Sequence, residues 1–584
     1  MWSLEMTERQ NMANKEASAN NTLTETGNWR LNWQWTNTAT YTKKIHEDHN
    51  ITVVLGTEAI KQGVGRYMQG TRIDYIFESD PNTWTLDNGS SSNIGNSSRY
   101  QRKVTMFGLF GRADYSYKGK YLATFTIRRD ASSKFGSKNR WGNFPSASLG
   151  WRMSDEKFME PTRKWLDDFK LRAGYGTTGN SNIGSYNYAF QYGTGNYYMY
   201  PITGSDSETS PGYVLSNLGD SDAKWETTKM FNIGFDLTAL SNRLTAGFDF
   251  YVKNTSDLLV PANWSALVGN ASKPSINIGD MKNRGIDLSI GWRDKVGEFG
   301  YNITANISRY KNEVTRLGSS DLFNDTRLSK VNITTVGQPV GMFYGYQIDG
   351  IYQNEQDVIS SGVLPYGVAT ENDLVASAWV GRYKMKDVNN DGKIDADDRT
   401  IIGNPHPDLT GGFNISLTWR DFDLSTYMYY SIGNDLYKHY EYYTMFGNLQ
   451  SNYSKDRLAK SWDPVNNPNG IYPLWTTTST EGPEAGNESN SNYVQDGSYL
   501  RMQTLTLGYS LPKKLLKKIG FEKIRVYGQI SNVFTITGYD GLDPEVRSHT
   551  SFENEYVSSD MNKGIDYGSY GMPRQFLMGV NVTF

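Results

Sequence analysis

The chain has 584 residues, of which 37% are hydrophobic, with 57 glycines, 40 tyrosines, 15 tryptophans and no cysteine. A formal net charge of −3 gives no electrostatic footprint for nucleic acid, and the lack of cysteine excludes disulfides, thiolate zinc sites and cysteine nucleophiles. No run of about 18 apolar residues is present, so the sequence predicts no transmembrane helix.

The first segment, Met1–Asn28, is polar and lacks the basic stretch and apolar run of a signal peptide. Beyond it, apolar and polar residues alternate, which predicts extended strands with one apolar and one polar face. The first two predicted strands are Trp29–Tyr41 and Asn50–Ile60, joined by the polar turn Lys43–Asp48.

The alternation is clearest over Arg102–Arg152, on both sides of the turn Lys118–Lys120. Apolar residues such as Phe125 follow polar ones such as Thr124, and aromatic residues lie near the strand ends. Strands of about ten residues or more with this pattern are typical of a transmembrane β-barrel, in which one face contacts lipid and the other faces water.

The same alternation continues to the end of the chain. We predict further strands at Phe169–Gly176, Trp225–Leu240, Asn242–Lys253, Asn283–Arg293, Gly300–Lys311, Gly412–Arg420, Phe422–Ser431, Tyr499–Leu511, Lys523–Asn532 and Arg574–Phe584, with weaker candidates at Tyr186–Tyr192 and Phe343–Tyr352. The total is roughly sixteen or seventeen strands. A one-residue change in the register of the last strand would place its polar side chains in hydrocarbon. We therefore predict which of its residues face lipid and which face the lumen. The lipid face has Phe576, Met578, Val580, Val582 and Phe584, and the lumen face has Leu577, Gly579, Asn581 and Thr583.

Two kinds of connection join these strands. Short turns such as Leu240–Asn242 and Asp421 are typical of the periplasmic side of a barrel. Long polar segments typical of extracellular loops lie at Arg72–Arg99, Asn180–Lys224, Asp257–Ile278, Ile351–Ile402 and Gly433–Gln495. Lys513–Ile519 predicts a short helical turn between strands, with a membrane-surface helix as the alternative. The predicted fold class is all-β, an antiparallel transmembrane barrel with long extracellular loops, in which residues 1–584 form one partial barrel domain.

One loop segment, Asp387–Asp398, has the oxygen-ligand spacing of an EF-hand calcium loop. The candidate ligands are side-chain oxygens and the backbone carbonyl of the residue at position 7; in chain order they belong to Asp387, Asn389, Asp391, Lys393, Asp395 and Asp398. Gly392 stands at position 6 and Ile394 at position 8, as in such loops, whereas position 12 is Asp in place of Glu. We expect a structural Ca²⁺ here; the alternative is a solvated acidic turn.

Catalytic motifs are missing from the sequence. His46-Glu47-Asp48-His49 is one residue short of the zinc-protease motif and falls in a predicted turn, and neither a Gly-x-Ser-x-Gly elbow nor a Walker loop occurs. We therefore predict that the chain is not an enzyme.

Several motifs in order resemble those of the SusC-like (SusC/RagA) TonB-dependent outer-membrane transporters. They are Arg128–Gly136, Asn139–Ser146, Trp165–Arg172, Tyr175–Asn180, Lys224–Thr228, Gly337–Gly341, Phe343–Tyr346, Asp387–Asp398 and Pro573–Phe576. The resemblance implies a Gram-negative outer-membrane location and a barrel of 22 strands blocked by a plug. It also implies energy coupling through TonB and a SusD-like surface lipoprotein that delivers oligosaccharides or peptides.

On this resemblance we expect the chain to be the C-terminal barrel portion of such a transporter, without the signal peptide, plug, TonB-binding box and first strands. TonB would then act through the missing plug segment, outer-membrane lipid would surround the wall, and no nucleic acid would bind. Expressed alone, such a portion is expected to have two unpaired sheet edges, which are costly in hydrocarbon. The alternatives are a passive porin-like or structural surface barrel without energy coupling, and a barrel enzyme, for which no set of acid, His or Ser residues is evident.

Overall fold

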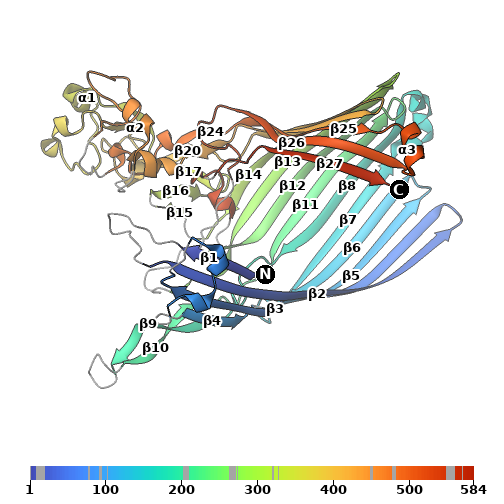
Figure 1. Cartoon of the computed structure of the whole chain (residues 1–584), viewed down its shortest axis with the longest axis horizontal. Coiled ribbons are helices and arrows are strands. Elements are labelled where there is room, and N and C mark those ends of the chain that lie inside the picture. Colours follow the sequence, from blue (N-terminus) through green and yellow to red (C-terminus); the bar gives the residue numbers. More distant parts are fainter. Residues whose placement is uncertain are drawn as a thin grey trace.

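The computed structural model shows one wide, curved antiparallel sheet with smaller elements gathered at one of its ends (Figure 1). It describes residues 2–7, 20–75, 79–90, 95–101, 103–201, 209–261, 271–272, 274–318, 321–326, 328–446, 452–475, 482–546, 559–568 and 570–584. Parts of all the predicted long loops except Ile351–Ile402, and the predicted boundary residue Arg102, lie outside these residues.

The main sheet has 17 strands. They are β1 (Trp2–Thr7), β2 (Thr22–Ile45), β3 (His49–Ile73), β4 (Gly95–Tyr100), β5 (Val104–Tyr117), β6 (Tyr121–Ser132), β7 (Trp141–Arg152), β8 (Leu166–Asn180), β11 (Glu226–Ala239), β12 (Leu244–Pro261), β13 (Ser275–Val296), β14 (Phe299–Arg316), β21 (Leu409–Trp419), β22 (Phe422–Ile432), β25 (Tyr499–Ser510), β26 (Lys523–Thr537) and β27 (Gln575–Thr583). Each pairs antiparallel with the next in this order, except that β4 and β5 lie end to end along β3.

The alternation predicted all the long strands of this sheet, and the all-β fold class is confirmed. The two weaker candidates were wrong as wall strands. Tyr186–Tyr192 is mainly a turn, in which Tyr186 has a positive φ of 65°, and Phe343–Tyr352 falls on two short strands outside the main sheet. Phe343, Tyr346 and Tyr352 are buried within the loops, whereas Tyr186, Phe190 and Tyr192 are exposed, so neither segment alternates toward lipid.

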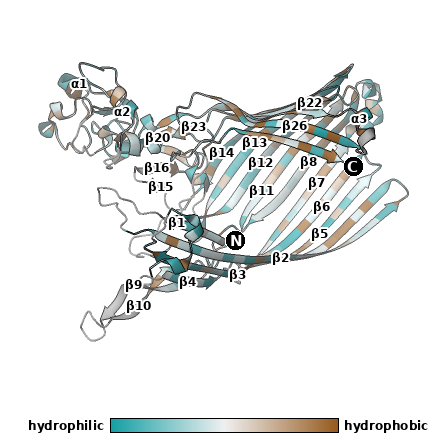
Figure 2. Cartoon of the chain, viewed as in Figure 1, coloured by the Kyte–Doolittle hydropathy of each residue, from teal (hydrophilic) through white to brown (hydrophobic). Residues whose placement is uncertain are grey.

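The register confirms the two faces predicted for β27. Val580 is paired with Val526, and Met578 with Gly528, whereas Asn581 is paired with Arg525. Directly paired residues share a face, so Val580 lies on the apolar face and Asn581 lies with the charged residues. Hydrophobic and hydrophilic bands alternate along the strands of the whole wall (Figure 2).

The long connections leave the wall at one end, which we call the loop end; the other end has the short turns. The smaller strands form separate sheets beyond the loop end. They are β9 (Gln191–Pro201) with β10 (Thr209–Asn217); β15 (Leu322–Thr326), β16 (Ser329–Thr334), β17 (Met342–Gly345) and β20 (Thr400–Gly403); β18 (Ile348–Ile351) with β19 (Tyr383–Met385); and β23 (Asp435–Tyr437) with β24 (Val494–Asp496). Helices α1 (Glu355–Ser360) and α2 (Lys455–Ala459) lie beside them, whereas α3 (Lys513–Ile519) joins β25 to β26, as predicted. No helix in the described ranges is both long and apolar enough to span a membrane.

Within these loops a set of buried side chains forms a compact core, which we call the loop core. It consists of Leu328, Val331, Phe343, Tyr346, Tyr383, Met385, Ile394, Tyr437, Met445, Phe446, Tyr472, Tyr493 and Ile565. These residues come from the connections between β14 and β21, between β22 and β25 and between β26 and β27, so those three loops are held as one packed body.

Candidate functional site: the inner wall and its rim

Charged side chains on the polar face of the sheet lie in ion pairs that cross neighbouring strands. On β6, Arg128 donates from Nε to both carboxylate oxygens of Asp130 at 2.9 Å, and it also pairs with Glu58 of β3. The glycine at position 108 leaves room for this cluster, because a side chain there would collide with the carboxylate of Asp130. The Arg128 guanidinium also lies 5.3 Å from the ring centre of Phe110.

A second cluster lies farther along the same face. Arg172 of β8 donates to both oxygens of Asp249 at 3.0 Å and to Asp236 at 3.0 Å. Lys170 completes the cluster with an ion pair to Asp236 at 2.8 Å. Two-pronged contact between arginine and a carboxylate fixes geometry as well as charge, so the cluster ties β8, β11 and β12 together across the inner wall.

A groove of about 520 Å³ opens on the inner face toward the loop end. Its lining includes Glu58, Arg128, Asp130, Phe144, Thr177 and Trp225. The rings of Phe144 and Trp225 lie 5.4 Å apart, and the indole nitrogen of Trp225 donates to the Arg140 carbonyl at 3.0 Å. Both rings are buried, at 8% and 7% exposed, and belong to a cluster with Phe135 and Ile183. The groove therefore offers a ligand mainly charged and polar side chains over a packed apolar base.

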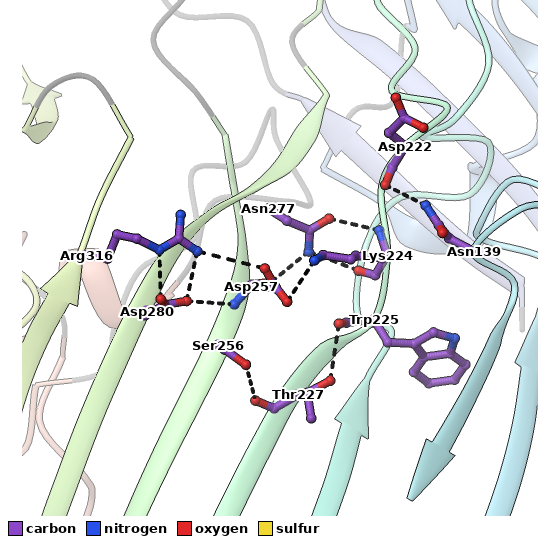
Figure 3. Close-up of polar contacts among 10 residues, drawn as sticks. All are labelled: Asn139, Asp222, Lys224, Trp225, Thr227, Ser256, Asp257, Asn277, Asp280 and Arg316. Carbon is purple, nitrogen blue, oxygen red and sulfur yellow. Dashed lines mark hydrogen bonds and ion pairs between the residues drawn. The ribbon is translucent and has the colours of Figure 1, made fainter.

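Above the groove, the loop ends of β11 to β14 are joined by a rim network (Figure 3). Arg316 donates to the two oxygens of Asp280 at 2.7 and 3.0 Å, and Lys224 pairs with Asp257 at 3.0 Å. Asn277 donates to the Lys224 carbonyl at 3.0 Å and to the Asp257 carbonyl at 2.6 Å. Asp257 has a positive φ of 60° where the β12–β13 register shifts. The network therefore fixes the point at which the strands leave the wall.

The predicted calcium loop lies at the edge of the loop core. Gly392 and Asn390 donate their backbone N–H groups to Asp387 at 2.8 and 2.7 Å, and the N–H of Asp391 donates to Asn389 at 3.0 Å. Asn390 and Gly392 both have positive φ, which gives the segment its tight curl. The predicted ligands Asp387, Asn389 and Asp391 therefore lie in one turn.

The second half of this loop is held by its other acidic residues. Asp398 is fully buried and accepts from the N–H groups of Val388 and Asp395 at 2.9 and 2.8 Å. The Lys393 ammonium lies 2.6 Å from Asp395 and lowers the pKa of that carboxyl. Ile394 is buried, and its N–H donates to the Leu364 carbonyl at 2.8 Å. Across the described ranges, no three His, Cys, Asp or Glu side chains are grouped closely enough to hold a metal.

Sequence reasoning did not single out the inner-wall clusters or the rim network. Arg128 and Arg172 were visible as polar-face residues, but their carboxylate partners are 64 to 77 residues away in the chain in several pairs. Only the strand register brings them together.

A family model described as "TonB dependent receptor-like, beta-barrel" matches residues 5–533. The chain belongs to this family. It is an outer-membrane β-barrel protein of Gram-negative type, as predicted.

Relatives of this TonB-dependent receptor barrel confirm the SusC-like resemblance. The chain is 34% identical over 497 residues to TonB-dependent receptor P3 of Formosa agariphila, covering 83% of this chain and 46% of that protein. It is 32% identical over 506 residues to TonB-dependent receptor SusC of Bacteroides thetaiotaomicron, covering 83% and 44%. The chain thus spans about half the length of the curated relatives it matches.

Among solved structures, that of the RagAB peptide transporter resembles the chain with a TM-score of 0.79 and 25% identity. The match covers 100% of this chain and 58% of that one. The similarity extends over the curved wall and the loops together, so the arrangement of the two is that of a RagA-like barrel.

Proposed function

We propose that the chain forms the barrel wall of an outer-membrane importer for oligosaccharides or peptides. The observation that carries this proposal is the groove on the inner face, where the Arg128 cluster lies beside Phe144 and Trp225. A polar inner wall offers a water-filled path, and the paired charges of the groove can bind a polar substrate weakly enough to release it. The chain catalyses no reaction in this proposal.

Two partners follow from the family and from the layout of the loops. A SusD-like surface lipoprotein would sit on the loop end, where the loop core presents a packed body rather than separate loops. TonB would act through the plug segment of such a transporter. The passive porin-like barrel remains the competing function, and energy coupling distinguishes the two.

The test is substrate uptake by cells that carry the gene in its native context. We expect growth on oligosaccharides or on peptides as the sole nutrient to depend on the gene, and uptake to stop when TonB is deleted or a protonophore is added. Arg128→Gln should weaken uptake at low substrate concentration, whereas Arg112→Gln, on the same face but not in the groove lining, should not. Uptake that persists without TonB and follows the concentration gradient would favour the passive barrel.

We also propose that Asp387–Asp398 binds a structural Ca²⁺. The donor set consists of hard oxygen atoms, which suits Ca²⁺. The tight turn that brings Asp387, Asn389 and Asp391 together supports the proposal. Asp387, Asn389, Asp391, Asp398 and the Lys393 carbonyl would hold the ion, with Asp395 bound directly or through a water.

Calorimetry on the intact protein tests this site. We expect calcium uptake that is lost in Asp387→Ala and kept in Glu371→Ala, since Glu371 is an exposed acidic residue of the same long loop. Equal uptake by both variants would contradict the site, as would no uptake by the unmodified protein.

A further inference from the structure

Five cationic side chains lie on the apolar, lipid-side face of β11, β13 and β14, near the loop ends of these strands. We call this set the outer basic patch; it consists of Lys229, Lys282, Arg284, Arg309 and Lys311. The register places them in adjacent rows with Asn254, Val252 and Phe250 of β12 between the neighbouring strands. In the same three rows the one carboxylate is Glu313, paired with Lys282 in the register.

The position of the patch on the outer face follows from the pairing. Alternate residues of a strand lie on one face, so Arg284 lies on the same face of β13 as Ile286, Leu288, Ile290 and Trp292. Arg284 is paired with Lys311, and Ile286 with Arg309. The side chains of Arg284, Lys311 and Arg309 therefore stand beside the lipid-facing Ile286. The directly paired Arg284 and Lys311 are about 5 Å apart, and Arg309 is about 7 Å from each of them.

The cations of the patch differ from those of the inner wall in their partners. Arg128 and Arg172 each contact two carboxylates. Within the described part of the chain, none of the five patch residues is in an ion pair or a side-chain hydrogen bond, and all but Lys282 are exposed. Uncompensated cations beside an apolar surface are unfavourable unless an anion from outside the chain meets them.

The height of the patch indicates which anion. From Trp292, near the short-turn end, to Arg284 is eight residues along β13. At about 3.3 Å per residue and a tilt of about 40°, this is about 20 Å along the membrane normal, close to the top of an apolar band about 25 Å tall. The patch thus lies at the headgroup level of the outer leaflet.

A groove of about 500 Å³ opens beside the patch, where β14 extends beyond the first residues of β21. Arg284, Arg309 and Lys311 line it together with Ile286 and Phe250, and the lining also includes Tyr310, His406 and the carboxylate of Asp408. It therefore combines three cations and one carboxylate, a net positive lining, with apolar surface that continues into the hydrocarbon band. An amphiphile with an anionic headgroup matches this combination, whereas a soluble anion matches only the cations.

We propose that the outer basic patch binds the phosphorylated sugar headgroup of lipid A, the lipid of the outer leaflet. Arg284, Arg309 and Lys311 contact its phosphates, since guanidinium and ammonium groups are the side chains that bind phosphate best. Ile286 and Phe250 contact its first acyl methylenes. The site fixes the height of the β11–β14 side of the wall relative to the outer leaflet, independently of what the barrel transports.

The test is titration of lipid A into delipidated intact protein, followed by native mass spectrometry. Each cation near an anionic lipid surface changes affinity by roughly five-fold, so Arg284→Gln/Arg309→Gln/Lys311→Gln should weaken lipid A binding on the order of 100-fold. The matched control, Lys43→Gln/Lys44→Gln/Lys295→Gln, removes the same charge from exposed positions at the short-turn end and should leave affinity unchanged. Heat-modifiable migration on gels verifies that both variants are folded.

Three further measurements distinguish lipid A from other partners of the patch. Lipid A with both phosphates should bind more tightly than its one-phosphate form, and more tightly than phosphatidylglycerol. Equal affinity of the patch variant and the unmodified protein would overturn the proposal, and so would phosphatidylglycerol binding as tightly as lipid A. A change of oligomeric state in the patch variant, with lipid A affinity retained, would assign the surface to contact between copies instead.

Discussion

Replacing Arg172 by Gln should destabilise the inner wall more than any comparable change at an isolated ion pair. The substitution removes the two bonds to Asp249 at 3.0 Å and the bond to Asp236 at 3.0 Å. Asp236 retains its ion pair with Lys170 at 2.8 Å, but the carboxylate of Asp249 loses the arginine that contacted both of its oxygens. The main cost is therefore that of leaving Asp249 partly desolvated without a cation.

The magnitude follows from the exposure of these groups. The Arg172 and Asp249 side chains are 31% and 27% exposed. Hydrogen bonds to charged groups contribute about 1.5–3 kcal/mol each when buried, and solvent screening reduces this, so we expect a net loss of about 2 kcal/mol. The Arg112–Asp114 pair, whose side chains are 54% and 33% exposed, provides the control, and Arg112→Gln should cost about 0.5 kcal/mol.

The assay is urea-induced unfolding of the intact protein, expressed from its gene in the native context, in detergent. Tryptophan fluorescence and heat-modifiable migration follow the transition. A double-mutant cycle with Asp249→Asn isolates the pair, and we expect a coupling energy of at least about 1 kcal/mol. Equal losses for Arg172→Gln and Arg112→Gln, or a coupling energy near zero, would refute the view that cross-strand clusters hold the inner wall.

Two other predictions concern the loop core and the sheet edges. Burial raises the pKa of Glu484 to about 7, from about 4.3 when unfolded, so the folded loops bind an extra proton and their stability falls as pH rises from about 4 to 7. Protease resistance of the loops should be lower at pH 8 than at pH 5, and Glu484→Gln should remove this dependence; a difference that persists in the variant would contradict it. Within the described residues, no strand pairs with the free edge of β27 or with β2 beyond Gly27 on the β1 side. Since unpaired backbone groups cost several kcal/mol each in hydrocarbon, the 584-residue chain expressed alone should not give a heat-resistant monomeric barrel, and recovery of one would show that the edges close on each other.

The wall could be predicted from the sequence because period-two alternation is a local property of each strand. Phe125 beside Thr126, or Val580 beside Asn581, indicates which face each residue occupies without knowledge of its neighbours. β1 carried the same signal, since Trp2, Leu4 and Met6 alternate with polar residues, but the polar surroundings hid it. β4 carried none, because Gly95–Tyr100 is polar and exposed on both faces.

The functional surfaces were less accessible to sequence reasoning. The proposed calcium loop could be predicted because its candidate ligands all lie within Asp387–Asp398, whereas the Arg172 cluster and the outer basic patch depend on register between strands. Lys282, Arg284 and Lys311 read as ordinary polar residues until pairing places Arg284 opposite Lys311 on the lipid face. The loop core escaped prediction because packing, rather than periodicity, selects Tyr346, Tyr437 and Tyr493.

The most direct test of the central claim, a membrane wall with a lipid face and a water-filled inner face, uses the lack of cysteine in the chain. Single cysteines are placed at Phe125 and at Thr126, neighbours in the middle of β6, and intact outer membranes are treated with a membrane-impermeant thiol reagent. We expect labelling of Thr126→Cys, which faces water, and protection of Phe125→Cys, which faces lipid. Labelling of Phe125→Cys with protection of Thr126→Cys, or equal labelling of both, would contradict it.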